Sequence, residues 1–187
     1  MLEKEIKVLI DYNMYNDLIK KFDFEEPYTQ TNYYYSNGVV DSNMTIRVRE
    51  IDGEMKLQVK NPKYISGSLH IKEEHECQIT NIPDSISKSA INELIGLEIP
   101  EDLNCIGKLI TERRICNKFD SVEIAIDINK YLDITDYELE IEYRNEYPND
   151  LIDTIKKMGI CLSEDVKGKN TRFNHRLKEV NDSACAS

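Results

Sequence analysis

Two glutamates and a lysine stand at alternate positions near the start of the chain, in the stretch LEKEIKV. On a β-strand Glu3, Glu5 and Lys7 would share one face, because side chains two residues apart point to the same side. Ile6 and Val8 would lie on the opposite face. Carboxylates can hold cations or protons, and an ammonium group can hold an anion. The spacing therefore indicates either a charged functional site or a charged face exposed to solvent.

The same alternation recurs along the rest of the chain. Further strand-like stretches place charged residues on one face and apolar residues on the other, with little of the Ser and Thr common on solvated strands. The charged faces carry Arg47, Arg49, Lys56, Lys60, Lys72, Glu74, Glu76, Glu123, Asp127, Glu138, Glu140 and Glu142.

The alternating stretches predict strands, and four stretches with helical spacing predict amphipathic helices. Strands are expected at residues 2–10, 29–36, 44–51, 55–60, 69–79, 106–116, 121–129 and 136–144. Helices are expected around residues 14–22, 86–95, 151–158 and 169–180. We expect an α+β fold, and eight strands suit a small closed antiparallel barrel.

Two arrangements fit this alternation. An open antiparallel sheet would bury its apolar face and leave the charged face in water. If the strands instead close into a barrel, the helices cover the apolar faces outside and the charged faces point inward. A charged interior is costly to desolvate, so the closed form requires a ligand that compensates this cost.

Length and composition narrow the classes of protein. The chain has 187 residues, a size typical of one domain, and we expect residues 1–180 to form it and residues 181–187 to be a frayed tail. Its net charge of −11 disfavours general binding to nucleic acid or to anionic membranes. Charges interrupt the first ten residues, so no signal peptide is expected, and no apolar run has membrane-spanning length. Five scattered cysteines without a CxxC pair are typical of reduced thiols in a cytoplasmic protein.

The ordered set of charged strands resembles the CYTH superfamily, also called triphosphate tunnel metalloenzymes. LEKEIKV carries the ExExK signature, TIRVRE resembles the paired-arginine strand, and KLQVK resembles the following lysine strand. KEEHE resembles the basic-x-Glu-x-Glu strand, while VEIAID and YELEIE resemble the closing acidic strands. TERRI supplies the later arginine, assigned to Arg113 with Arg114 as the alternative register. The TDYELE stretch is typical of a Firmicute-type branch.

Two segments depart from the family pattern. Ser36 stands where family members often carry an aspartate on the second strand, and the C-terminal basic residues Lys167, Lys169 and Arg172 match only loosely.

The resemblance implies an eight-stranded antiparallel barrel, an open-ended triphosphate tunnel, with amphipathic helices packed outside. It implies substrate binding by Lys7, Arg47, Arg49, Lys56, Lys60, Lys72 and Arg113. It implies Mg²⁺ or Mn²⁺ binding by Glu3, Glu5, Glu76, Glu138 and Glu140. Glu5, Lys7 and Asp127 are the expected catalytic residues, and Glu142 is alternatively expected to pair with a tunnel arginine.

The leading functional hypothesis is a metal-dependent hydrolase of tripolyphosphate, thiamine triphosphate or a nucleoside triphosphate. A class IV-type adenylate cyclase and a non-catalytic polyphosphate-binding module are alternatives. The expected partner is a small triphosphate or polyphosphate, with neither nucleic acid nor membrane, and the sequence gives no prediction of oligomeric state.

Overall fold

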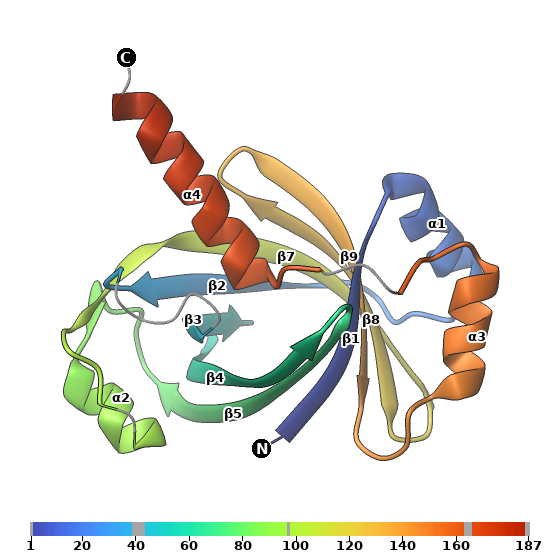
Figure 1. Ribbon diagram of the computed structural model, residues 1–187, viewed down its shortest axis with the longest axis horizontal. Helices are drawn as coiled ribbons and strands as arrows, with labels where there is room; N and C mark the ends of the chain where they lie inside the picture. The colour runs from blue at the N-terminus through green and yellow to red at the C-terminus, as the bar shows by residue number, and fades with distance from the viewer. Residues whose placement is uncertain (1, 39–43, 97, 163–165, 186–187) are drawn as a thin grey trace.

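The fold is a closed antiparallel barrel with helices around it, as the sequence predicts (Figure 1). The computed structural model describes residues 2–38, 44–96, 98–162 and 166–185. The strands are β1 (Leu2–Ile10), β2 (Tyr28–Ser36), β3 (Thr45–Ile51), β4 (Glu54–Ser66), β5 (Leu69–Ile79), β6 (Ser85–Ile86), β7 (Leu103–Phe119), β8 (Val122–Tyr131) and β9 (Ile134–Tyr143). The helices are α1 (Tyr12–Lys21), α2 (Lys88–Ile95), α3 (Asn149–Lys157) and α4 (Lys169–Cys185).

Eight strands close the barrel in the order β2-β3-β4-β5-β1-β9-β8-β7, and the pairing of β2 with β7 completes it. The short β6 extends the edge of β7. Because the barrel is closed, each long strand has one face toward the interior and one toward the outside. The charged residues at alternate positions therefore lie inside, and the open-sheet alternative is excluded.

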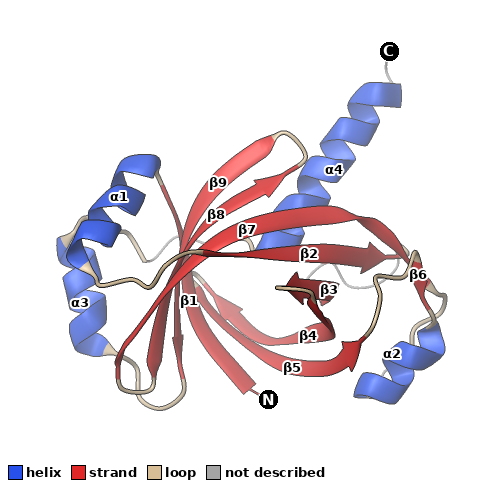
Figure 2. Ribbon diagram, turned by 180° about the vertical axis from the view of Figure 1, so that it is seen from behind, coloured by secondary structure: helices blue, strands red, loops and turns tan. Residues whose placement is uncertain are grey.

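The apolar outer faces are buried under three of the helices (Figure 2). Leu18 of α1 and Ile155 of α3 are fully buried in one cluster with Ile6, Leu139 and Ile141 of the neighbouring strands. A second cluster forms where α2 covers the outer faces of β3 and β4. Burial of such side chains is the main favourable term in folding, so these two clusters hold the barrel closed.

The predicted elements are confirmed, with differences at their ends. β4 and β7 are longer than expected, because each continues beyond the region of strict alternation. Residues 181–185, expected as part of a frayed tail, continue α4, and residues 186–187 lie outside the described residues. No helix in the described ranges is both long enough and apolar enough to cross a membrane.

α4 differs from the other helices, because it begins at an end of the barrel and projects away from it (Figure 1). Phe173 in its second turn is fully buried in a small cluster with Tyr34, Leu109 and Tyr131. Its ring centroid lies 5.1 Å from that of Tyr34. Gly107 of β7 faces Tyr34 in the β2–β7 ladder, and a Cβ atom at Gly107 would lie 2.8 Å from Phe173 Cζ. The missing side chain makes room for the ring that anchors α4.

We predict that Gly107→Ala destabilises the protein by about 2–4 kcal/mol, because alanine would be strained at φ +140° and would collide with Phe173. Urea unfolding measures the change. Gly168→Ala is the matched control, since the nearest atom to its added Cβ is at 3.8 Å. Equal stability of the two variants would contradict this packing.

Candidate functional site

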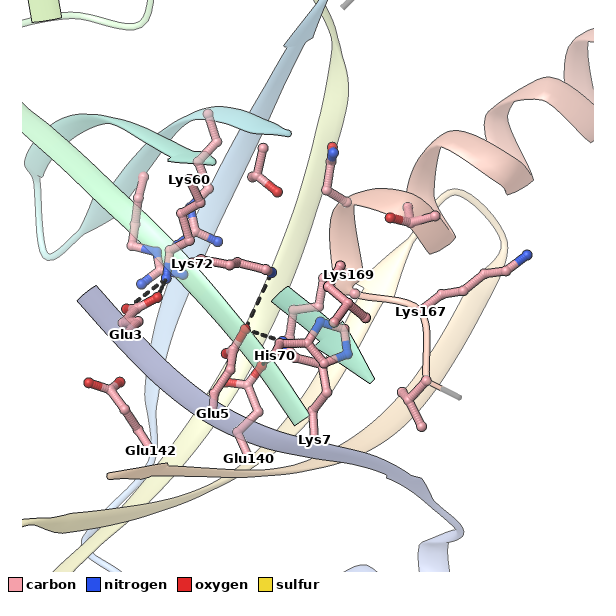
Figure 3. Close-up of a pocket in the computed structure, with 18 of the residues that line it drawn as sticks. Glu3, Glu5, Lys7, Lys60, His70, Lys72, Glu140, Glu142, Lys167 and Lys169 are labelled. Carbon is pink, nitrogen blue, oxygen red and sulfur yellow. Dashed lines mark hydrogen bonds and ion pairs between the residues drawn. The ribbon is translucent and has the colours of Figure 1, made fainter. Parts of the chain in front are cut away.

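The barrel encloses a cavity of about 420 Å³ that is lined mainly by charged side chains (Figure 3). These side chains come from strands on all sides of the barrel and from the segment that leads into α4. The charged lining consists of Glu3, Glu5, Lys7, Arg47, Arg49, Lys60, Lys72, Arg113, Glu123, Glu140, Glu142, Lys167 and Lys169.

Two arginines of β3 face the cavity without a carboxylate partner among the described residues. Arg47 Nε donates to Gln58 Oε1 at 2.9 Å, and Arg49 Nε donates to Asn32 Oδ1 at 3.0 Å. Neither guanidinium forms an ion pair with any described residue, and Arg47 Nη2 has no hydrogen-bond partner among them. Burial and then the charges of Arg47 and Arg113 lower the pKa of Arg49. This wall of the cavity therefore carries positive charge that the described chain leaves unneutralised.

Lys7 and Lys72 share the carboxylate of Glu5, with Nζ–Oε1 distances of 2.8 and 3.3 Å. Burial alone would raise the pKa of Glu5, but the two ammonium groups outweigh it and lower the pKa. Burial and the charge of Lys7 lower the pKa of Lys72 to about 8. Lys7 also lies 3.5 Å from Glu140, which Arg113 and Lys169 contact as well, so the cations in this part of the cavity share their carboxylates.

Lys60 lies between two carboxylates at another part of the wall. Its Nζ is 2.6 Å from Glu3 and 3.4 Å from Glu74. Burial raises the pKa of Glu3 to about 7, against the attraction of Lys60 and with a further contribution from Glu74. Glu74 therefore belongs to one charged cluster with Glu3 and Lys60, of which Glu3 and Lys60 line the cavity.

Lys56 and Glu76, expected to bind substrate and metal, are not in the cavity. Their side chains are 47% and 41% exposed, and Lys56 Nζ pairs with Glu76 Oε1 at 2.6 Å. They share the inward face of β4 and β5 with Lys60 and Glu74, but lie farther along the strands, where the barrel opens. The alternation of residues along each strand predicted the correct face for Lys56 and Glu76. It does not predict how deep in the tunnel a side chain lies, because that depth depends on the geometry of the closed barrel.

Lys169 at the start of α4 reaches three carboxylates inside the barrel. Its Nζ lies 2.8 Å from Asp127, 2.7 Å from Glu138 and 2.8 Å from Glu140. Arg172, one turn later, pairs with Glu138 at 2.9 Å. The three carboxylates each offer an oxygen within 4.8 Å of the others, a spacing that a metal ion could use. In this structure the Lys169 ammonium group contacts all of them.

Asp127 is fully buried and does not line the cavity. Its carboxylate binds the guanidinium group of Arg113 instead. Arg113 donates to its two carboxylate oxygens at 2.8 and 2.7 Å, and the same guanidinium contacts Glu140. Asp127 is therefore placed to hold Arg113, not to meet a water molecule directly. Arg113 is the arginine that enters the cavity, whereas Arg114 donates to the Glu25 carbonyl outside it.

The structure brings most of the expected residues to one cavity and adds others. Glu138, expected to bind metal, is fully buried behind the lining and bound to Lys169 and Arg172. Lys169 and His70 were not among the predicted site residues. Parity with Lys72 could have identified His70, whereas the position of Lys169 depends on how α4 docks.

We predict that Glu138→Gln lowers the free energy of unfolding by about 3–5 kcal/mol at pH 7, because it leaves Lys169 and Arg172 with less buried counter-charge. Despite burial, Lys169 and Arg172 lower the pKa of Glu138 to about 2 from 4.5. The carboxylate thus stabilises the fold fully above pH 4.5, and this contribution is lost as the pH falls through about 2.

Urea unfolding at pH 7 and pH 3 measures this effect, and the difference between Glu138→Gln and the unsubstituted protein should narrow at pH 3. Glu76→Gln is the control, because its exposed ion pair contributes less than about 1 kcal/mol. A pH-independent difference would rule out the ionic origin of the effect.

Comparison with known proteins identifies the family. The CYTH domain model matches residues 1–167, while comparison with curated proteins gives no match. A candidate adenylate cyclase from Bacillus halodurans is 22% identical, with a TM-score of 0.70 over 90% of this chain and 95% of that chain. An adenylyl cyclase candidate from Hippeastrum with a dominant triphosphatase activity is 18% identical, with a TM-score of 0.68 over 92% and 95%. The Mimivirus capping enzyme triphosphatase is 12% identical, with a TM-score of 0.51 over 84% and 89%. The match over most of its length shows that this chain belongs to the CYTH domain family.

Proposed function

We propose that this protein is a divalent-metal-dependent triphosphatase acting on inorganic tripolyphosphate or an organic triphosphate. The observation that carries the proposal is the pair Arg47 and Arg49, which face the cavity without a carboxylate partner among the described residues. Buried like charges repel each other, so a site of this kind favours an anion of high charge. A triphosphate supplies several negative charges along one short chain.

The cations divide into two kinds by geometry. Arg47, Arg49 and Arg113 offer planar guanidinium groups, which bind phosphate oxygens in pairs. Lys7, Lys60 and Lys72 offer ammonium groups along the β1, β4 and β5 part of the wall. Together they can contact successive phosphates without a glycine-rich backbone loop, which the sequence lacks.

The acidic side chains of the cavity fit a hard divalent cation. Glu3, Glu5 and Glu140 line it and offer the oxygen ligands that Mg²⁺ and Mn²⁺ prefer. We assign the metal to these three because they line the cavity, whereas Glu138 is fully buried behind the lining. When bound, such an ion polarises phosphate oxygens and lowers the pKa of a coordinated water.

The proposed reaction is hydrolysis at the terminal phosphorus. The oxygen of a water molecule forms a bond to that phosphorus, the bond to the bridging oxygen breaks, and tripolyphosphate yields orthophosphate and pyrophosphate. Glu5 faces the cavity and stays ionised beside its lysines, so we assign it to orient the water. Lys7 neutralises charge that develops on the phosphate oxygens. Asp127 is a positioning residue, because it acts through Arg113.

The composition of the cavity wall favours hydrolysis over cyclisation. An adenylate cyclase must bind the adenine ring and aim the ribose hydroxyl at the α-phosphate. Among the described residues, the aliphatic lining consists of Ile65 and Val166, with the rings of Tyr28 and Tyr34 in addition. Pockets for organic ligands are usually lined mainly by apolar and aromatic side chains. The charged wall is better matched to the phosphate chain than to a base.

We predict that the protein, incubated with Mg²⁺ or Mn²⁺, releases orthophosphate from tripolyphosphate. Chromatography of parallel incubations with ATP and thiamine triphosphate would identify the preferred substrate. Cyclic AMP with pyrophosphate as the main products would show a cyclase instead. Binding without turnover would show a non-catalytic polyphosphate-binding module.

Arg49→Met should lower kcat/KM for the preferred triphosphate by about 10²–10³-fold, because it removes a positioned donor from the phosphate site. Lys56→Met is the control, because Lys56 is a cation on the neighbouring strand β4 whose side chain lies outside the cavity. Steady-state phosphate release measures both. Equal losses in the two variants would contradict the placement of the site.

Chelation by EDTA should abolish turnover, and Mg²⁺ or Mn²⁺ should restore it. Glu5→Gln should weaken Mn²⁺ binding, measured by electron paramagnetic resonance of the free ion, because the amide has no charge to offer the metal. Glu76→Gln should bind Mn²⁺ as the unsubstituted protein does, since Glu76 is paired outside the cavity. Turnover that persists in EDTA would exclude a metal-dependent reaction.

A further inference from the structure

His70 of β5 is a buried histidine in the wall of the charged cavity. It is 3% exposed and occupies the same strand face as Lys72, two residues later. In the β1–β5 ladder it lies opposite Glu5. Figure 3 shows its ring in the wall of the cavity, which Lys7 and Val166, in the segment that leads into α4, also line.

Neither ring nitrogen of His70 has a hydrogen-bond partner among the described residues. The backbone of Val166 lies near enough to influence the ring, but without hydrogen-bond geometry. A buried polar group without a partner costs stability, and buried histidines in protein cores normally have one. An imidazole that lines a cavity with both nitrogens free is therefore placed for a ligand rather than for packing.

The surroundings of His70 keep its ring neutral. Burial, followed by the charges of Lys7 and Lys72, lowers its pKa to about 4, although Glu5 opposes this. A neutral imidazole offers one N–H donor and one acceptor nitrogen. It can therefore bind an anion between two lysines without adding a further positive charge that would repel them.

We propose that the imidazole of His70 donates a hydrogen bond to a phosphate oxygen of the bound triphosphate, at the part of the cavity next to α4. This inference rests on the proposed triphosphate-binding function and adds a ligand-contacting residue to it. Lys7 and Lys72 supply charge, whereas the imidazole supplies a directional donor that fixes the position of the phosphate.

Nitrogen-15 NMR of the imidazole rings tests the contact on the intact protein. The chain has three histidines, and His75 and His175 are paired with Glu73 and Glu179 outside the cavity. Tripolyphosphate added in EDTA, at constant pH, should shift the ring nitrogen of His70 and leave the other two unchanged. The EDTA excludes turnover, so the readout reports binding alone.

Substitutions show which nitrogen donates. His70→Leu should weaken tripolyphosphate binding in EDTA by about 10- to 100-fold, the usual effect of losing a hydrogen bond to a charged group. The amide nitrogen of asparagine can replace imidazole Nδ1, and that of glutamine can replace Nε2. One of His70→Asn and His70→Gln should therefore retain more affinity than His70→Leu. His75→Leu is the matched control on the same strand, and calorimetry measures all four.

The outcomes separate this inference from the proposed function. Tripolyphosphate binding with an unshifted His70 resonance, or with unchanged affinity in His70→Leu, would overturn the role of His70 and leave the triphosphate site intact. No binding by the unsubstituted protein, with or without Mg²⁺, would overturn both. A shift confined to His70, together with loss of affinity in His70→Leu but not in His75→Leu, would establish the contact.

Discussion

The burial of charge inside a closed barrel is the constraint on which the rest of this structure depends. Closing eight strands turns their apolar faces outward, where α1, α2 and α3 cover them, and turns their charged faces inward. Desolvating such an interior costs free energy that only ion pairs, hydrogen bonds or a ligand can offset. The outer clusters supply the apolar burial that keeps the barrel closed despite this cost.

The charges inside the barrel are not evenly paired: some cations are neutralised by neighbouring carboxylates and others are not. Around Glu138, anions and cations neutralise each other through Lys169 and Arg172. Along β3, Arg47 and Arg49 have no described carboxylate partner, and Glu5 serves two lysines at once. The neutralised part of the interior has a structural role, whereas the part with excess positive charge is suited to a polyanion.

α4 links the fold to the site, because it places a cation where a metal ion could otherwise bind. Phe173 anchors the helix over Gly107, and Lys169 then reaches Asp127, Glu138 and Glu140. The same docking brings residues 166–171 against the cavity beside His70. The end of the tunnel is therefore built jointly by a strand and by the C-terminal helix.

The sequence by itself determined the eight barrel strands, the strand face that each charged residue occupies, and the family, whereas the short β6 was not predicted. Alternation with period two follows directly from strand geometry, so Glu3, Glu5 and Lys7 could be assigned to one face without coordinates. Depth along the tunnel and contacts between distant segments were decided only by the tertiary structure. Lys56 and Lys60 have the same parity, yet one is solvated and the other lines the cavity. Lys169 lies far in the sequence from the carboxylates that it binds. The local pattern of residues therefore could not predict which buried charges the docked helix contacts.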